Sequence, residues 1–248
     1  MAARALQQST SASTPVVEAT RLSRTFGGRR AVDDVSFTLH AGDCLALFGP
    51  NGVGKTTLLR MLAGLLAPSA GHCEVDGIAL RSGPGARARV GLVSHASMLY
   101  GALSALENVA FSARMHGVRQ PLEAARDALA MMRVADRGDA PVRALSRGLQ
   151  QRVSIARAIV HRPRLLLCDE PYTGLDDAGA AALTAALHER RRSGAALLVV
   201  THNLSEGLSL ASHTAIMRRG RFARLETRGD VDPAAYATQY RDLVTADA

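Results

Sequence analysis

Lysine is nearly absent from this chain of 248 residues. Lysine and arginine together number 30, and the single lysine is Lys55. A lone lysine among arginines indicates a position that requires a compact ammonium on a flexible stem, which a planar guanidinium does not replace. The segment around Lys55 is therefore the first candidate for a functional site.

Long apolar runs are lacking as well. No stretch is apolar over enough residues to cross a membrane, so the sequence predicts no spanning helix. Residues 1–14 are rich in Ser, Thr and Ala but have no apolar centre, which argues against a secretion signal. We expect these residues to form a flexible tail.

Cysteine is scarce. The three cysteines, Cys44, Cys73 and Cys168, are widely spaced, and two of them lie inside apolar, strand-like runs. This pattern favours buried free thiols in a reducing cytosol over a disulfide or a metal site.

Acidic residues are outnumbered, and the formal net charge is +8. A basic balance is compatible with nucleic acid or an anionic membrane surface as a partner. The arginines are spread out, however, apart from short clusters at 190–192 and between Arg218 and Arg224. Solvated faces explain most of them, so charge alone does not select a function.

The segment around Lys55 fits the phosphate-binding pattern G-x-x-x-x-G-K-[ST]. Its residues are Gly49, Pro50, Asn51, Gly52, Val53, Gly54, Lys55, Thr56 and Thr57. The apolar run 44–48 before it predicts a buried parallel strand, and Leu58, Leu62 and Leu65 after it recur at helical spacing. Glycines allow backbone N–H groups to face one centre at the positive end of the helix, where phosphate binds. Lys55 would then contact the outer phosphates, and the Thr56 hydroxyl would ligate Mg²⁺.

Other elements can be placed from their patterns. Strands are expected from Val16 to Phe37 with a turn at Gly27-Gly28, at Cys73–Val75 and Val90–Val93 around a loop at 81–86, at 165–168, at 195–200, and in a last hairpin at 216–222. Helices are expected at 102–117, 121–134, 148–160 and 178–192, with Leu122, Ala125, Leu129 and Met132 on a core-facing side of the second. The tail from Asp230 onward is weakly patterned.

Three of the apolar strands end in polar residues. One ends in the phosphate loop, one in Asp169-Glu170 and one in Thr201-His202. In an open parallel α/β sheet, ligands bind beyond the carboxyl ends of the strands. These groups should therefore converge on one nucleotide.

Each polar group has a role in such a site. Asp169 is placed to hold Mg²⁺, directly or through water. Glu170 is the candidate for polarising the attacking water, and His202 can hydrogen-bond the γ-phosphate. An acidic pair after a strand can also be a simple surface turn, but the phosphate loop makes that alternative weaker.

The segment Leu145-Ser146-Arg147-Gly148-Leu149-Gln150-Gln151-Arg152 places a serine hydroxyl and a glycine N–H at the start of a helix. That arrangement suits an anion. Read alone, the segment is better explained as a plain helix cap.

Taken in this order, the motifs resemble the ATP-binding subunit of ABC transporters over about residues 16–225. LSRGLQQR is similar to the signature motif of that family, LLLCDEP to the Walker B strand, 173–176 to the D-loop and His202 to the switch histidine. The resemblance implies an α/β fold: a P-loop NTPase (RecA-like) core with a mainly parallel sheet, an N-terminal antiparallel β subdomain and a helical subdomain. The cassette would cover residues 15–228, with the helical subdomain at about 96–160 and a C-terminal extension at 229–248.

The sequence departs from the family pattern at two places. Arg147 and Leu149 replace a glycine and the glutamine of the signature, while Ser146 and Gly148 remain. His95 stands where most relatives carry the Q-loop glutamine, and because imidazole is a poor Mg²⁺ ligand, we expect it to act through water or to link the site to neighbouring helices. His95, the following 103–108 segment and the YTGLD wording resemble the haem-exporter ATPase of cytochrome c maturation and related exporter ATPases.

The resemblance implies a mechanism and partners. Two cassettes, as a homodimer or heterodimer, would bind ATP and Mg²⁺ between the phosphate loop of one and Ser146 and Gly148 of the other. Phe26 would stack on adenine; the alternative for this ring is an aromatic at the edge of the core. Closure and hydrolysis would drive a separate multi-span membrane subunit docking near 97–111, where Tyr100, Leu103 and Phe111 are candidate contacts or plain core residues. The chain would lie peripherally on the cytoplasmic face of the cell membrane, with no specific nucleic acid expected.

Two other functions remain open. A soluble ABC ATPase acting on nucleic acid or ribosomes would explain the basic charge, but such proteins usually carry insertions or two cassettes. A small-molecule kinase built on a phosphate loop would leave Ser146 and Gly148 without a role.

Overall fold

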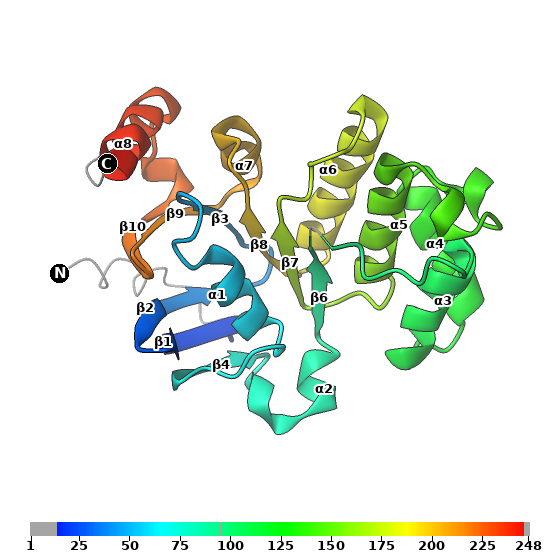
Figure 1. Ribbon diagram of the computed structural model, residues 1–248, viewed down its shortest axis with the longest axis horizontal. Coiled ribbons are helices and arrows are strands. Elements are labelled where there is room, and N and C mark those ends of the chain that lie inside the picture. The colour runs from blue at the N-terminus through cyan, green and yellow to red at the C-terminus, as the bar shows by residue number, and fades with distance from the viewer. Residues whose placement is uncertain (1–13, 95, 246–248) are drawn as a thin grey trace.

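The computed structural model describes residues 14–94 and 96–245, and its strands form two sheets (Figure 1). Most of the expected tail at 1–14, and His95, lie outside the described residues. Within the described ranges, no helix combines the length and the hydropathy that a bilayer-spanning segment requires.

The first sheet is antiparallel and has the order β2-β1-β4-β5. Its strands are β1 (Val17–Phe26), β2 (Arg29–Leu39), β4 (Ala70–Val75) and β5 (Ile78–Ala79). Gly27 and Gly28, both with positive φ, turn β1 into β2, so the hairpin expected from the sequence is confirmed. This sheet is the N-terminal antiparallel subdomain.

The second sheet is mainly parallel and has the order β10-β9-β3-β8-β7-β6. Its strands are β3 (Cys44–Phe48), β6 (Val90–Val93), β7 (Leu165–Asp169), β8 (Ala196–Val200), β9 (His213–Arg218) and β10 (Arg221–Thr227). Only β10 runs antiparallel to its neighbour. The residues of β3, β7 and β8 are all buried, as their unbroken apolar runs predict, and the three strands end at the same edge. The predicted fold class is confirmed.

Helices cover the sheet and extend to one end of the molecule. They are α1 (Lys55–Leu62), α2 (Pro84–Arg87), α3 (Ala105–Met115), α4 (Pro121–Met131), α5 (Arg147–Ile159), α6 (Asp177–Arg192), α7 (Leu204–Leu210) and α8 (Pro233–Thr245), with short 3₁₀ turns η1 (Leu80–Ser82), η2 (Ala135–Arg137), η3 (Val142–Ala144) and η4 (Arg228–Asp230). Helices α3, α4 and α5 pack together at the end opposite β1, β2 and α8 (Figure 1).

The strands of the main sheet contribute to different hydrophobic layers with alternate residues. In β7, Leu166 and Cys168 join the core shared with α3 to α6, whereas Leu165 and Leu167 join the core beneath the antiparallel sheet and α1. Burial on both faces fixes the register of the strands, and therefore fixes where each strand ends. All three cysteines are free and buried, as expected.

Four details differ from the sequence expectations. The segment 81–86 is not an open loop, because η1 and α2 occupy it. Leu65 and Leu122 are exposed. Leu65 lies beyond the end of α1 at Leu62, and Gly64, which has a positive φ, turns the chain just before it. Leu122 lies in the first turn of α4. The weakly patterned tail forms α8, whose Tyr236 is buried edge-on against Phe48 at 5.8 Å between ring centroids.

Candidate functional site

The loop between β3 and α1 has the tight backbone that a phosphate cradle requires. Gly54 has a φ of 110°, and a Cβ at this position would lie 2.0 Å from the carbonyl oxygen of Ala31. Gly49 has a φ of 150°, and its Cβ would meet the Met217 carbonyl oxygen at 2.5 Å. Only glycine fits such contacts. The loop can therefore lie close against β2 and β9 while α1 begins directly at Lys55.

Lys55 is held against this loop. Its Nζ donates to the carbonyl oxygens of Gly49, at 2.6 Å, and Pro50, at 2.8 Å, and the residue is only 7% exposed. Burial lowers the pKa of Lys55, while the nearby charges of Glu170 and Asp169 act in the opposite direction. The ammonium thus lies in a confined position between the loop and two carboxylates.

Two oxygen donors meet at the start of α1 and the end of β7. Thr56 donates from Oγ1 to Oδ2 of Asp169 at 3.1 Å. A hydroxyl beside a carboxylate is a donor set that suits Mg²⁺, which keeps several waters and takes its remaining ligands from substrate phosphates. The described residues contain no cluster of three or more His, Cys, Asp or Glu that would form a dedicated metal cage. The residues present therefore fit Mg²⁺ bound together with a nucleotide.

Glu170 and His202 form the other side of the site. The His202 Nε2 lies 3.2 Å from Oε1 of Glu170, and the His202 backbone N–H donates to Oε2 at 3.3 Å. Glu170 has a φ of 50°, in the left-handed region that non-glycine residues seldom adopt. Its own N–H still donates to the Val200 carbonyl oxygen at 2.9 Å, which holds this conformation in place. Unusual backbone held by its surroundings is typical of functional sites.

One cavity of about 320 Å³ joins these groups. It is lined by Ala31, Asn51, Gly52, Gly54, Lys55, Thr56, Thr57, Asp169, Glu170 and His202. The predicted convergence of the three strand ends is therefore confirmed.

A second cavity of about 410 Å³ continues from the first, since both are lined by Ala31, Gly52 and Thr57. Val53 and the half-exposed ring of Phe26 also line it, and the Arg24 guanidinium lies 4.6 Å over that ring. Three arginines also line this cavity: Arg219, which belongs to the cluster between Arg218 and Arg224, and Arg29 and Arg30, which no sequence pattern pointed to. A flat ring bordered by positive charge suits a base and its phosphates.

Ser146 and Gly148 lie elsewhere. Neither is among the described residues that line the two cavities around the phosphate loop. Ser146 is exposed and caps α5, accepting from the Leu149 N–H at 3.3 Å. Gly148 lies against the D-loop, because a Cβ there would be 2.9 Å from the Gly174 carbonyl oxygen. The signature segment therefore contacts the D-loop of its own chain rather than its own phosphate loop.

An ion pair that the sequence analysis missed connects this segment to the next helix. The buried Arg152 of α5 pairs with Asp176, and it also donates to the Arg133 carbonyl oxygen at 3.2 Å. Asp176 caps α6 by accepting from the Gly179 N–H, and that hydrogen bond together with Arg152 lowers the pKa of the carboxyl. The signals in the sequence were the arginine that ends LSRGLQQR and the aspartate that ends 173–176, but nothing in the sequence paired them.

The fold and the two joined cavities define a P-loop nucleotide-binding protein. The family model described as "ABC transporter" matches residues 32–173, which is more than half of the chain. The chain belongs to the ABC transporter family.

Curated relatives include importers and an exporter. The spermidine/putrescine import ATP-binding protein PotA of Pseudomonas aeruginosa is 39% identical over 86% of this chain and 59% of its own length. The cobalt import ATP-binding protein CbiO of Rhodobacter capsulatus is 39% identical over 84% and 77%. The Nod factor export ATP-binding protein I of Ralstonia nicotianae is 35% identical over 84% and 66%. The chain thus spans about 59% of the length of the polyamine relative.

Solved structures show the same fold. One described as the ATP binding subunit of an ABC transporter aligns with a TM-score of 0.82 at 27% identity, covering 94% of this chain and 97% of its own. A dimeric ATP-binding cassette in a post-hydrolysis state, bound to ADP and Pi, aligns with a TM-score of 0.77 at 24% identity over 86% and 98%. The second likeness concerns the fold alone.

Proposed function

We propose that this chain is the ATP-hydrolysing subunit of an ABC transporter. The observation that carries the proposal is the single cavity in which Lys55, Thr56, Asp169, Glu170 and His202 meet. Lys55 and Thr56 open α1, Asp169 ends the buried strand β7, and Glu170 and His202 come just after β7 and β8. The fold itself therefore sets their arrangement. The family match favours a transport subunit over the alternatives of a nucleic-acid ATPase or a kinase.

In this proposal each residue has one task. The loop N–H groups and Lys55 bind the β- and γ-phosphates of ATP, while Thr56 and Asp169 hold Mg²⁺. The metal, when bound, neutralises charge on the phosphates. Glu170 orients a water for attack on the γ-phosphorus, and His202, already in contact with Glu170, keeps that carboxylate in line. The products are ADP and inorganic phosphate.

The exposed signature segment requires a second cassette. Ser146 presents its hydroxyl and the start of α5 to solvent, outside the cavities around Lys55. A helix start of this kind binds anions, and the γ-phosphate of a nucleotide held by another copy is the ligand that we propose. Two cassettes in a head-to-tail dimer, identical or not, would each complete the site of the other.

A candidate surface for a membrane subunit lies beside the nucleotide site. We define the docking patch as five large apolar side chains that are between 41% and 70% exposed: Leu65, Met98, Tyr100, Phe111 and Met115. The rings of Tyr100 and Phe111 meet edge-on at 5.6 Å, and Met115 lies one turn beyond Phe111 on α3. Exposed apolar patches of this kind mark interaction sites. Leu103 is only partly exposed, so it is not one of the five residues of the docking patch.

The loop that carries Tyr100 is anchored from below by Asn108, which is 2% exposed. Its side-chain amide donates to the carbonyl oxygens of Tyr100, Leu103 and Ser104, and its Oδ1 accepts from the Tyr100 N–H at 2.8 Å. A buried amide with every contact satisfied fixes the loop on α3. The docking patch is therefore connected rigidly to the helices.

A small cavity of about 90 Å³ connects the docking patch with the nucleotide site. Leu65 and Met98 of the patch line it together with Thr56 and Asp169. A shift of Thr56 and Asp169 on hydrolysis would therefore move the wall of the cavity directly beneath the docking patch. This is the physical route by which we propose that hydrolysis drives the membrane subunit.

Cargo and direction are a narrower proposal. This chain is similar both to relatives named for import, at 39% identity, and to one named for export, at 35%. A haem-related exporter of cytochrome c biogenesis has only the sequence wording around His95 and 172–176 in its support. We also propose the domain limits that the resemblance implies, which are a cassette at 15–228, a helical subdomain at about 96–160 and a C-terminal extension at 229–248. The chain would lie peripherally on the cytoplasmic face of the membrane.

Co-expression with candidate multi-span membrane proteins, beginning with any that is encoded beside this gene, tests the transport role. The membrane fraction should retain the chain, and the double substitution Tyr100→Ala with Phe111→Ala should release it. Leu122→Ala is the matched control, because Leu122 is exposed to a similar degree (43%) but lies on α4 outside the docking patch. A chain that never partitions to membranes, with or without its neighbour, would exclude a transport subunit.

A further inference from the structure

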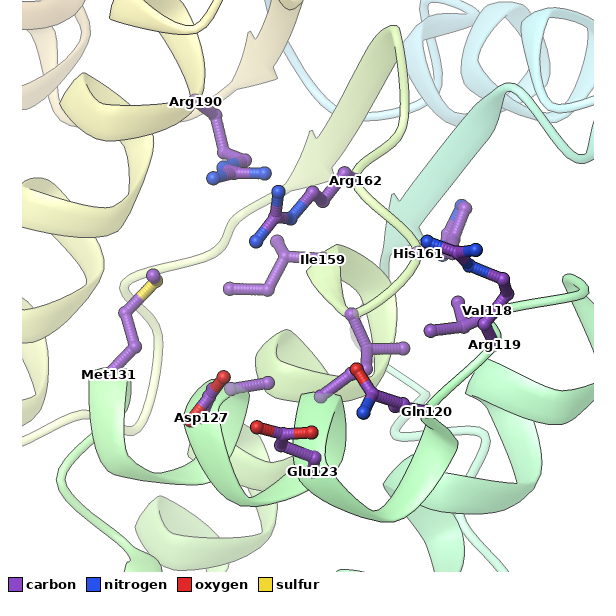
Figure 2. Close-up of a pocket in the computed structure, with 13 residues that line it drawn as sticks. Val118, Arg119, Gln120, Glu123, Asp127, Met131, Ile159, His161, Arg162 and Arg190 are labelled. Atoms are coloured by element: carbon purple, nitrogen blue, oxygen red, sulfur yellow. The ribbon is translucent and has the colours of Figure 1, made fainter.

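One hollow away from the phosphate loop lies between α4, the end of α5 and α6. It has a volume of about 450 Å³, and none of its lining residues belongs to the nucleotide cavities. Figure 2 shows that Arg162 and Arg190 extend into it from one side, while Glu123 and Asp127 of α4 face it from the other. We call this hollow the arginine pocket.

Among residues 14–94 and 96–245, the buried cation Arg190 has no counterion of its own. It is 9% exposed, and its Nε is buried with no hydrogen-bond partner in the described part of the chain. The charges acting on it are Arg162, which repels it, and Glu189, which attracts it. Glu189 is already paired with Arg192 at 3.0 Å. Burying such a group is unfavourable unless an anion accompanies it, and burial accordingly lowers the pKa of Arg190.

Arg162 adds a second guanidinium to the same wall. Its charge acts on Arg190, so the two side chains lie close enough to repel each other. An anion placed between the two guanidinium groups would offset this repulsion and accept hydrogen bonds from their N–H groups. Guanidinium groups recognise carboxylate and phosphate through paired hydrogen bonds, which makes an oxyanion the matching ligand.

The opposite wall limits the ligand. Glu123 and Asp127 are acidic, and Met131, Ile159 and Val118 supply apolar surface between the two walls. A volume of 450 Å³ suits a small molecule. A polyanion would meet repulsion from the carboxylates, whereas a molecule with one anionic end would not.

We propose that the arginine pocket binds a small molecule through one carboxylate or phosphate group, with Arg190 and Arg162 as its ligands. This site is separate from the nucleotide site and does not depend on the function proposed for it. Occupancy would tie α5 to α6, at the join between the helical end of the molecule and the sheet.

Thermal unfolding of the full chain tests this assignment. Butyrate, which carries a single carboxylate, and inorganic phosphate are the two probes, titrated against sodium chloride at constant ionic strength, with Mg²⁺ and ADP saturating so that the phosphate loop is occupied. A ligand that binds only the folded state raises Tm saturably with concentration. A response to butyrate alone identifies a carboxylate site, and a response to phosphate alone identifies a phosphate site.

Three single variants locate the response. Arg190→Gln and Arg162→Gln should each weaken the apparent affinity for the active probe about 10-fold or more, as expected for losing a charged hydrogen-bond donor. Arg192→Gln, on the same helix but exposed, should respond as the unchanged chain does. If Arg190→Gln does not fold, Arg162→Gln carries the test, because its side chain is exposed. No response to either probe, or an equal response in the Arg162 and Arg192 variants, would overturn the proposal.

Discussion

The two halves of the proposed ATP site differ in how far one chain completes them. Lys55, Asp169 and Glu170 lie in one cavity, joined by hydrogen bonds and charge to the loop, Thr56 and His202. Ser146, in contrast, is exposed, and its hydroxyl caps its own helix by accepting from the Leu149 N–H. The first half, with Lys55, Asp169 and Glu170, forms when the chain folds, and we call it the built half. The second half, with Ser146, faces outward, and we call it the outward half. Its chemistry would depend on pairing with a second cassette, and the following substitutions distinguish the two halves.

Glu170→Gln should have the largest effect, on the built half. Turnover should fall about 10²- to 10⁴-fold, because the amide cannot assist the attacking water, while ATP binding survives. Phosphate release and binding of a fluorescent ATP analogue measure the two separately. Glu189→Gln, an exposed carboxylate on α6, is the control. Unchanged turnover would show that Glu170 is not the residue that activates water.

Lys55→Met should lower ATP affinity about 10- to 100-fold, the usual value of a hydrogen bond to a charged group. Equilibrium binding of the same analogue measures the loss. Arg60→Met is the control, since Arg60 lies on the same helix but does not line the cavity around Lys55. Equal affinities in both variants would separate Lys55 from phosphate binding.

Ser146→Ala tests the outward half. Loss of the cap should destabilise the chain by about 1 kcal/mol, and turnover should fall about 10-fold without any change in nucleotide binding to the single chain. Ser104→Ala removes an equivalent cap from α3 and should match the stability loss while leaving turnover intact. If ATP binding falls together with turnover, the role across two cassettes is wrong.

The smallest effect is a pH dependence of the built half. Because burial lowers the pKa of Lys55 below its ordinary 10.5, the folded state binds this proton more weakly than the unfolded state does. Stability that is lost at neutral pH is therefore regained as pH rises from the lowered pKa towards 10.5. The difference in Tm between the unchanged chain and Lys55→Met should shift in favour of the unchanged chain over this window. A constant difference would mean that the surroundings of Lys55 do not perturb its protonation.

Much of the built half could be predicted from sequence because it depends on local rules. Apolar runs identified β3, β7 and β8, and parallel strands must end at one edge, so Asp169 and His202 had to lie near Lys55. What escaped prediction depends on contacts between distant segments. The packing of Tyr236 on Phe48 holds α8, and the Arg152–Asp176 pair connects two helices. Neither leaves a periodic pattern in the chain.

The scarcity of lysine has a practical consequence. Apart from the α-amino group at the start of the chain, Lys55 carries the only primary amine, and its lowered pKa makes more of it the nucleophilic free base at mildly alkaline pH. Reductive ¹³C-methylation would therefore install a single side-chain NMR probe inside the nucleotide cavity. Protection of this amine from an acylating reagent would report site occupancy directly, without a mutation or a labelled ligand.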